Sequence, residues 1–201
     1  MIPLLLAAAL KISTPPPLTC AELKAPEIAA LAGKDVKITL NLEKTSLDRV
    51  FKALGEQARF HTTFRGYTPV VNANLPDVPL ERALADLARQ YGLSIRAIAA
   101  DRLEVAGPLA PDVGGVGRPT LKTKKGPSPG PELARFGKVV LQVVVCEDGK
   151  VGAIAASPGT EEPRLVDTAI EAVRQWIYEP ALRDGKPVAV SLTTVVDFRR
   201  D

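Results

Sequence analysis

The chain is poor in the residues from which metal sites and nucleophilic catalytic sites are usually built. Its 201 residues include one histidine and two cysteines. A zinc site needs three or four closely placed Cys, His or carboxylate ligands, and Cys20 and Cys146 are far apart in the sequence. His61 lies in a predicted strand between Phe60 and Thr62, and the chain has no Gly-x-Ser-x-Gly motif. We therefore expect a protein that is not an enzyme and that uses no cofactor and no metal.

The apolar run at the start of the chain is short. Ile2–Leu10 falls well below the roughly 20 apolar residues that a membrane-spanning helix needs, so no transmembrane span is expected. The run has the length of the apolar region of a signal peptide, although no Lys or Arg precedes it. We predict that residues 1–20 are a leader and that the protein is exported. The alternative is a cytoplasmic protein with an apolar tail.

The two cysteines give little information about the cellular compartment of the protein. Leu18-Thr19-Cys20 is only weakly similar to a lipidation site, because Pro17 stands where such sites usually have Leu, so lipidation or peripheral membrane association is a weakly supported alternative. Cys146 ends a predicted strand on the face opposite its apolar residues, which favours exposure or an interface. A Cys20–Cys146 disulfide would join a leader to a distant domain, and we do not expect it.

Strong charge of one sign is also missing. The formal net charge is +3, and the densest basic spot, Lys122-Thr123-Lys124-Lys125, lies in a Pro/Gly-rich stretch without interleaved aromatic residues. A nucleic-acid site normally combines a basic face with aromatics. We therefore expect no nucleic-acid partner and interpret the basic spot as a solubilising patch.

Proline and glycine are abundant and clustered. The chain has 18 Pro and 15 Gly, and they gather between Pro108 and Pro131. With few apolar anchors this stretch cannot bury a core of its own. We predict a flexible linker at residues 108–134, which would join two small α+β domains that fold independently.

Residues 34–107 show two rounds of strand and helix patterning. The period-2 stretch at 36–42 predicts a strand, and apolar residues at helical spacing from Leu47 to Ala58 predict a helix. After strands near 60–64 and 70–75, Pro79 suits the first turn of a second helix and Gly92 its left-handed end. Strands at 93–98 and 103–105 close the unit, which gives the order β-α-β-β-α-β-β.

This unit resembles the secretin and TonB-receptor N-terminal short domain. The motifs that carry the resemblance are Leu40-x-Leu42, Leu47-x-x-Val50-x-x-x-Leu54, Val78-Pro79-Leu80-x-x-Ala83-Leu84-x-x-Leu87 and Tyr91-Gly92-Leu93. The entry to the second helix, Val-Pro-Leu-x-x-Ala-Leu, is the most specific of them. The resemblance implies a small α+β domain of the cell envelope.

Residues 135–201 read as β-β-α-β. Alternation over Val139–Val145 and the turn signal Asp148-Gly149 predict a hairpin. A helix that opens at Pro163 and runs through Ile177 is expected to end before Pro180. We expect Trp176 to be a core residue of this helix, and a long strand, Val188–Phe198, to end the chain.

This last part resembles the C-terminal domain of TonB-family energy transducers. The resemblance rests on Gly137-Lys138-Val139, Asp148-Gly149-Lys150-Val151, Ala169-x-x-Ala172-Val173-x-x-Trp176, Pro180-Ala181 and Gly185-Lys186-Pro187-Val188, in that order. It implies a periplasmic adaptor that contacts an outer-membrane receptor or a secretin-type protein and performs no chemistry of its own.

The final strand is the predicted binding site. It is long for a small sheet, and an edge that carries few charges invites an extended segment to add as another strand. The residues we expect to bind a partner are Ser191, Leu192, Thr193, Thr194, Val195 and Val196. The alternative is that a second copy of the chain occupies this edge, which would make the protein a self-associating structural module. A small-ligand carrier or enzyme with its pocket between the domains is disfavoured, because no site constellation is present.

Overall fold

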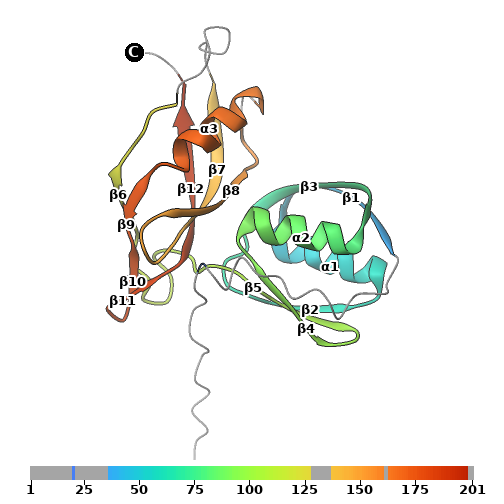
Figure 1. Ribbon diagram of the computed structural model, residues 1–201. Coiled ribbons are helices and arrows are strands. Elements are labelled where there is room, and N and C mark those ends of the chain that lie inside the picture. The colour runs from blue at the N-terminus through green and yellow to red at the C-terminus, as the bar shows by residue number, and fades with distance from the viewer. Residues whose placement is uncertain (1–19, 21–35, 128–136, 161–162, 199–201) are drawn as a thin grey trace, which may run out of the picture.

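The structure is a computed structural model that describes residues 20, 36–127, 137–160 and 163–198. The protein has an α+β fold in two halves that lie side by side (Figure 1). Among the described residues, no helix combines the length and the apolar character that crossing a membrane requires.

The N-terminal half has the predicted order of elements. Strand β1 (Lys37–Ser46) leads into helix α1 (Leu47–Ala58), and β2 (His61–Arg65) and β3 (Val70–Pro79) precede helix α2 (Leu80–Tyr91). Strands β4 (Ser94–Ala99) and β5 (Arg102–Ala106) follow. Strand β1 pairs antiparallel with β3, whereas β2, β5 and β4 form a separate sheet in that order.

The two helices bury the faces that their periodicity predicts. Gly92 ends α2 in the left-handed region at φ 62°, as expected for a C-terminal glycine. The helices share one apolar core with β1, β3, β4 and β5. Its helical members are Leu47, Val50, Phe51, Leu54 and Ala58 of α1 and Leu80, Leu84, Leu87, Ala88 and Tyr91 of α2.

The C-terminal half is built on a three-stranded antiparallel sheet in the order β12-β7-β8. Its strands are β7 (Lys138–Val145), β8 (Val151–Ala156) and β12 (Val190–Asp197). A short 3₁₀ turn, η3 (Pro163–Leu165), and helix α3 (Val166–Val173) cover one face of this sheet. The core between them contains Val139, Leu141, Val143, Val145, Leu165, Ala169, Val173, Trp176, Val190 and Val196.

The helix of this half is shorter than predicted. Helix α3 ends at Val173, and Ile177–Glu179 form strand β9 instead of a last helical turn. The Tyr178 N–H donates to the Gly149 carbonyl oxygen at 2.8 Å, so β9 pairs with the β7–β8 turn. Strands β10 (Ala181–Arg183) and β11 (Lys186–Val188) then form a hairpin before β12. Trp176 is buried, as expected, but from the turn after the helix.

The predicted linker does not run free over its described part. The Leu109 N–H donates to the Ala189 carbonyl oxygen at 3.1 Å, and Gly117 N–H donates to Leu182 at 2.8 Å. Val116 is buried in the C-terminal core, and β6 (Thr120–Thr123) pairs antiparallel with β9. The expectation of a flexible linker at 108–134 is therefore wrong for residues 108–127, because a few apolar anchors and backbone hydrogen bonds hold them. Residues 128–134 lie outside the described residues.

The two halves pack against each other through the sheet face that α3 leaves uncovered. A Cβ added at Gly92 would lie 3.2 Å from Ala153 Cβ and from Val144 Cγ2. Ala155 of β8 is buried in the core of the N-terminal half. The sheet therefore lies between α3 and the end of α2, which contradicts the expectation that the two parts are independent units.

A disulfide joins the start of the chain to this junction, contrary to our expectation. Cys20 and Cys146 are bonded, with Cα atoms 5.6 Å apart. The Cys20 N–H also donates to the Glu147 carboxylate, at 3.0 Å to Oε1 and 3.2 Å to Oε2. Cys146 does lie on the face opposite the apolar side chains of β7, but it is 7% exposed. Distance along the sequence was a poor guide, since packing of the halves brings the two segments together.

Candidate partner-binding site

The predicted binding strand is an edge strand. Residues of β12 pair only with β7 in the sheet, from Val190 opposite Val145 to Asp197 opposite Lys138. On its outer side, Leu109 forms a parallel bridge with Val190. The Ser191 N–H donates to the Leu109 carbonyl oxygen at 2.9 Å. The first residues of β12 are therefore covered on both sides, and the rest extend beyond this bridge.

Backbone geometry shows which groups of β12 face outward. In a strand the backbone N–H and C=O of alternate residues point to opposite sides. Since Ser191 bonds outward to Leu109, the backbone groups of Thr193 and Val195 also point away from β7. In the described part of the chain, no hydrogen bond satisfies these outward groups of Thr193 or Val195. This is the unpaired stretch that an added strand would use.

The side chains of the predicted residues divide between the two faces of the sheet. Leu192 and Val196 pack toward the core under α3, and the register places Thr194 on the same face. Ser191, Thr193 and Val195 are on the opposite face, where Val195 is 49% exposed. Thus the six predicted residues form one strand, but within the described residues only Thr193 and Val195 offer outward backbone groups without a partner.

The buried side chain of Gln142 bonds to two side chains on this face of β12. Gln142 of β7 donates from Nε2 to Ser191 Oγ at 2.7 Å and accepts from Thr193 Oγ1 at 3.1 Å. Gln142 and Ser191 are both buried. These two hydrogen bonds satisfy a buried amide and fix the position of β12 at the point where its outer edge opens.

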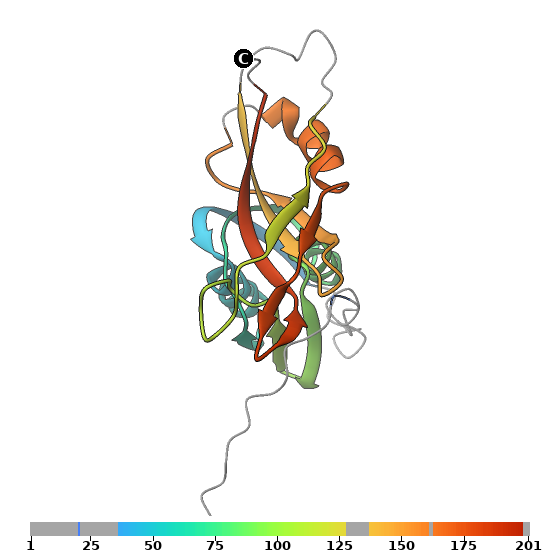
Figure 2. The same cartoon turned by 90° about the vertical axis from the view of Figure 1, so that its left-hand side faces the viewer.

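A hollow of about 530 Å³ runs beside the open part of β12. In the view of Figure 2, β6 lies between β12 and β9. The hollow is lined by β12, by residues of the segment 110–121, by Trp176 and Tyr178, and by Tyr67 of the N-terminal half. The lining residues that matter below are Pro111, Val113, Pro119, Leu121, Trp176, Tyr178, Ser191, Leu192, Thr193 and Thr194.

The wall opposite β12 is held by Trp176. Its indole Nε1–H donates to the Lys125 carbonyl oxygen at 2.8 Å, and Lys124 Nζ lies 5.6 Å from the centre of its ring. Trp176 and Tyr178 are neighbours in the same core, with ring centres 6.5 Å apart. Burial raises the pKa of Tyr178, so its hydroxyl stays neutral at physiological pH. In the sequence, Trp176 and Tyr178 would have indicated this wall only if the helix had been predicted to end at Val173.

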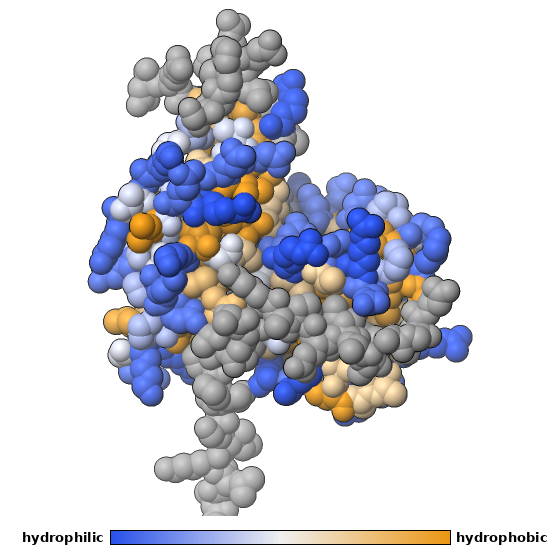
Figure 3. Space-filling view, in the orientation of Figure 1, coloured by the Kyte–Doolittle hydropathy of each residue, from blue (hydrophilic) through white to orange (hydrophobic). Residues whose placement is uncertain are grey.

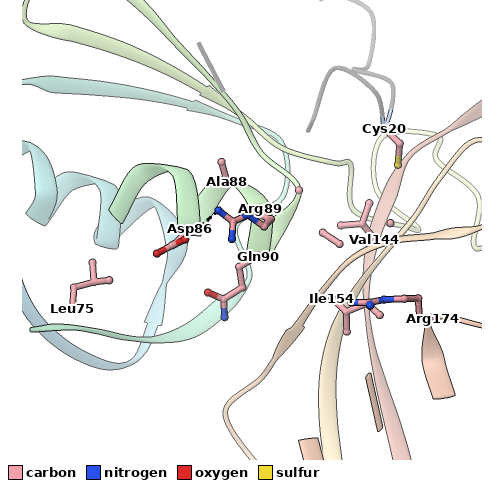
Figure 4. A pocket seen from close by; sticks show the side chains of 12 residues that line it. Cys20, Leu75, Asp86, Ala88, Arg89, Gln90, Val144, Ile154 and Arg174 are labelled. Atoms are coloured by element: carbon pink, nitrogen blue, oxygen red, sulfur yellow. Dashed lines mark ion pairs between the residues drawn. The ribbon is translucent and has the colours of Figure 1, made fainter. Parts of the chain in front are cut away.

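A second hollow, of about 870 Å³, lies between the two halves. Figure 4 shows α2 on one side and β8 on the other, with Arg89 beside Asp86 and Arg174 reaching toward Ile154. The Arg89–Asp86 pair is exposed, at 3.3 Å, so it adds little energy. This hollow contains the Cys20 side chain and lies at the junction of the halves.

The disulfide excludes one metal arrangement. One ligand atom each from Cys20, Cys146 and Glu147 lie within 4.8 Å of one another. Because the two sulfur atoms are bonded to each other, neither is a free thiolate, and thiolate is the form of Cys that ligates metals. His61 lies in β2 at the surface, far along the chain from this group.

Exposed apolar side chains are scattered over the rest of the surface. Figure 3 shows hydrophilic side chains over most of this face, with apolar patches on the C-terminal half and along the lower side of the N-terminal half. The large apolar side chains exposed in the described residues are Val70, Ile98, Val113, Leu121, Ile177, Leu182 and Val195. Two of these side chains, Val113 and Leu121, line the hollow beside β12, whereas the other five do not.

Comparison with known proteins finds a match for the C-terminal part of the chain. Residues 131–199 match the sequence model of the family described as "Gram-negative bacterial TonB protein C-terminal". A solved structure, the solution NMR structure of the Pseudomonas aeruginosa TonB CTD, is similar at 19% identity and a TM-score of 0.35. The match covers 46% of this chain and 93% of that one. No curated protein matches the chain.

The family match confirms the predicted resemblance of the last domain to the TonB C-terminal domain. The resemblance of residues 34–107 to the secretin and TonB-receptor N-terminal short domain stays a prediction.

Proposed function

We propose that this protein is an exported, non-enzymatic adaptor that binds an extended segment of an outer-membrane receptor by strand addition to β12. The match of residues 131–199 to the TonB C-terminal family supports a role in TonB-dependent transport or signalling. The N-terminal half would contribute a second contact to a receptor or a secretin-type protein, on the strength of its sequence motifs alone.

One observation carries the proposal: the outward backbone groups of Thr193 and Val195 have no partner among the described residues. Proteins usually protect such edges with charge, proline or a bulge. Here Ser191 to Val196 carry no charge and no proline. Main-chain hydrogen bonds to an added strand would satisfy these groups, and side chains at alternate positions would give specificity.

The disulfide supports a periplasmic location. Disulfides persist in oxidising compartments and are rare in the cytosol. The bond also requires Cys20 to be retained, so a leader would end before residue 20 and not at it. Lipidation of Cys20 would compete for the same sulfur atom, which makes it the weaker alternative for membrane association. Residues 1–19 lie outside the described residues.

The alternative occupant of the edge is a second copy of this chain. Strands β12 and β8 are both outer strands of the same sheet, so either could pair with its equivalent in another molecule. Light scattering across a range of concentrations separates this dimer from the adaptor.

Removing one outward N–H tests the proposal. We expect Thr193→Pro to bind receptor peptides at least about tenfold more weakly, because one hydrogen bond of about 1.4 kcal/mol is lost and the proline ring obstructs pairing. The ligands are synthetic peptides that copy the amino-terminal segments of outer-membrane receptors from the same organism, and binding is measured by calorimetry. Thr193→Ala is the matched control, since it keeps the N–H and should bind within about threefold of wild type. Equal affinity of Thr193→Pro and Thr193→Ala, with both folded, would show that β12 is not the binding edge.

A further inference from the structure

The hollow beside β12 has a second wall that belongs to the segment 110–121. After Leu109 bridges to Val190, the chain leaves the edge and returns as β6, which pairs with β9. Pro111, Val113, Pro119 and Leu121 line the side of the hollow across from β12. The segment therefore covers the start of the edge at Leu109 and then leaves it. Beyond that point, the outward groups of Thr193 and Val195 have no partner among the described residues.

A strand added to β12 would occupy this hollow. Neighbouring strands lie about 4.8 Å apart, and their side chains alternate between the two faces of the sheet. On the core face, the hollow is bounded by Leu192 of β12 and by Trp176 and Tyr178. A side chain of the added strand that points to this face would be enclosed by apolar and aromatic groups. Only an apolar side chain gains free energy there.

Two lysines, Lys122 and Lys124, lie next to this wall without lining the hollow. Among the described residues that line the hollow, the only charged side chain is Arg118, which already pairs with Asp112. Lys122 on β6 and Lys124 beyond it have no ion pair in the described part of the chain, and Lys124 lies over the Trp176 ring. An acidic side chain of the added strand that extends past the lining toward β6 would reach these cations, and no carboxylate of the described residues lines the hollow to compete with it.

We infer that the segment 110–121 is the second wall of the partner site, and that it selects an extended segment with an apolar side chain toward Leu121, Trp176 and Tyr178 and an acidic residue near Lys122 and Lys124. This inference rests on the proposed function, since it assumes that the partner pairs with β12. It adds that the Pro/Gly-rich segment is a specificity element of the site, so a C-terminal domain that lacks this segment binds the same partner less well.

A pair of matched leucine variants tests the wall. Leu121 is 37% exposed and lines the hollow, whereas Leu182 of β10 is 48% exposed and lies outside its lining. For the receptor peptide that binds wild type, we expect Leu121→Ser to weaken binding by about ten- to a hundredfold, as loss of an apolar contact with a side chain of this size predicts. Leu182→Ser should bind within about twofold of wild type. Neither side chain is in the core, so both variants should fold, which thermal melts check.

Charge exchange tests the second part of the inference. Lys122→Glu should weaken binding of the same peptide, and replacing the acidic residue of the peptide by Lys should restore at least half of the lost affinity in the variant.

Equal binding by Leu121→Ser and Leu182→Ser, with Thr193→Pro impaired, overturns the second wall and leaves the proposed function in place. Normal binding by Thr193→Pro overturns both, and so does the absence of binding by any receptor peptide to wild type.

Discussion

Breaking the Cys20–Cys146 disulfide is expected to lower the free energy of unfolding by about 4 kcal/mol. The bond closes a loop over a sequence separation of 126 residues, and cross-links of this span restrict the unfolded chain strongly, with about 4.7 kcal/mol predicted for a 100-residue loop. The bond also fixes Cys20 beside Gly152 and Val144, at the junction of the two halves. Loss of the bond should therefore weaken the contact between the halves as well as the total stability.

Urea unfolding with and without a phosphine reductant measures this effect. The Cys20→Ser/Cys146→Ser double variant is the control, because its unfolding midpoint should not respond to reductant and should match that of the reduced wild type. A thiol assay on the denatured protein reports whether the bond was present at the start. Oxidised wild type with no free thiol and the same midpoint as the double variant would contradict the structural role of the bond.

Trp176→Ala is expected to cost about 3–5 kcal/mol of stability, the usual range for removal of a buried aromatic side chain. Trp176 is 3% exposed and packs in the C-terminal core. Its indole N–H also bonds to the Lys125 carbonyl oxygen at 2.8 Å, so the variant loses one of the bonds that hold the segment after β6. We therefore expect residues 120–125 to exchange their amide hydrogens faster in the variant than in wild type.

Ile177→Ala is the matched control for Trp176→Ala. Ile177 follows Trp176 directly but is 45% exposed, and its truncation should cost less than about 1 kcal/mol. Chemical unfolding of the three proteins gives the comparison. A Trp176→Ala variant with wild-type stability would contradict the core role of this side chain, whatever its effect on peptide binding.

The elements of the N-terminal half could be predicted because several local signals agreed there. Periodic apolar residues in α1 and α2 coincide with Pro79 before the second helix and Gly92 after it. The same residues form the core. The first N–H of each helix does bond to a distant carbonyl, Leu47 to Pro69 and Leu80 to Val36, but the local signals place the helices correctly without these bonds.

The linker and the last helix were mispredicted for a shared reason. Strand β6 has only four residues, all exposed, and it becomes a strand because β9 pairs with it. In turn, Trp176, Ile177 and Tyr178 continue the helical spacing of α3, and only pairing with Gly149 and β6 shows that they form a turn and a strand. Composition and periodicity describe local preference, whereas these two segments are set by long-range hydrogen bonds.

The binding edge was predictable in part. The long, uncharged final strand could be identified from the sequence, but two facts depend on tertiary structure. Leu109 covers Ser191, so only the later outward residues remain open. The wall across the hollow comes from a segment whose composition gave no sign of a site.

Register-dependent disulfide cross-linking tests the central claim, strand addition to β12, most directly. The native cysteines are bonded to each other, so a single Thr193→Cys or Val195→Cys variant has one free thiol. Each variant is mixed with receptor peptides that carry one cysteine at successive positions. We predict that Thr193→Cys and Val195→Cys prefer peptide positions two residues apart, as the two-residue period of paired strands requires. Peptides that bind but cross-link to neither variant, or to both with the same positional pattern, would contradict strand addition, and cross-linking of the protein only to itself would indicate the dimer.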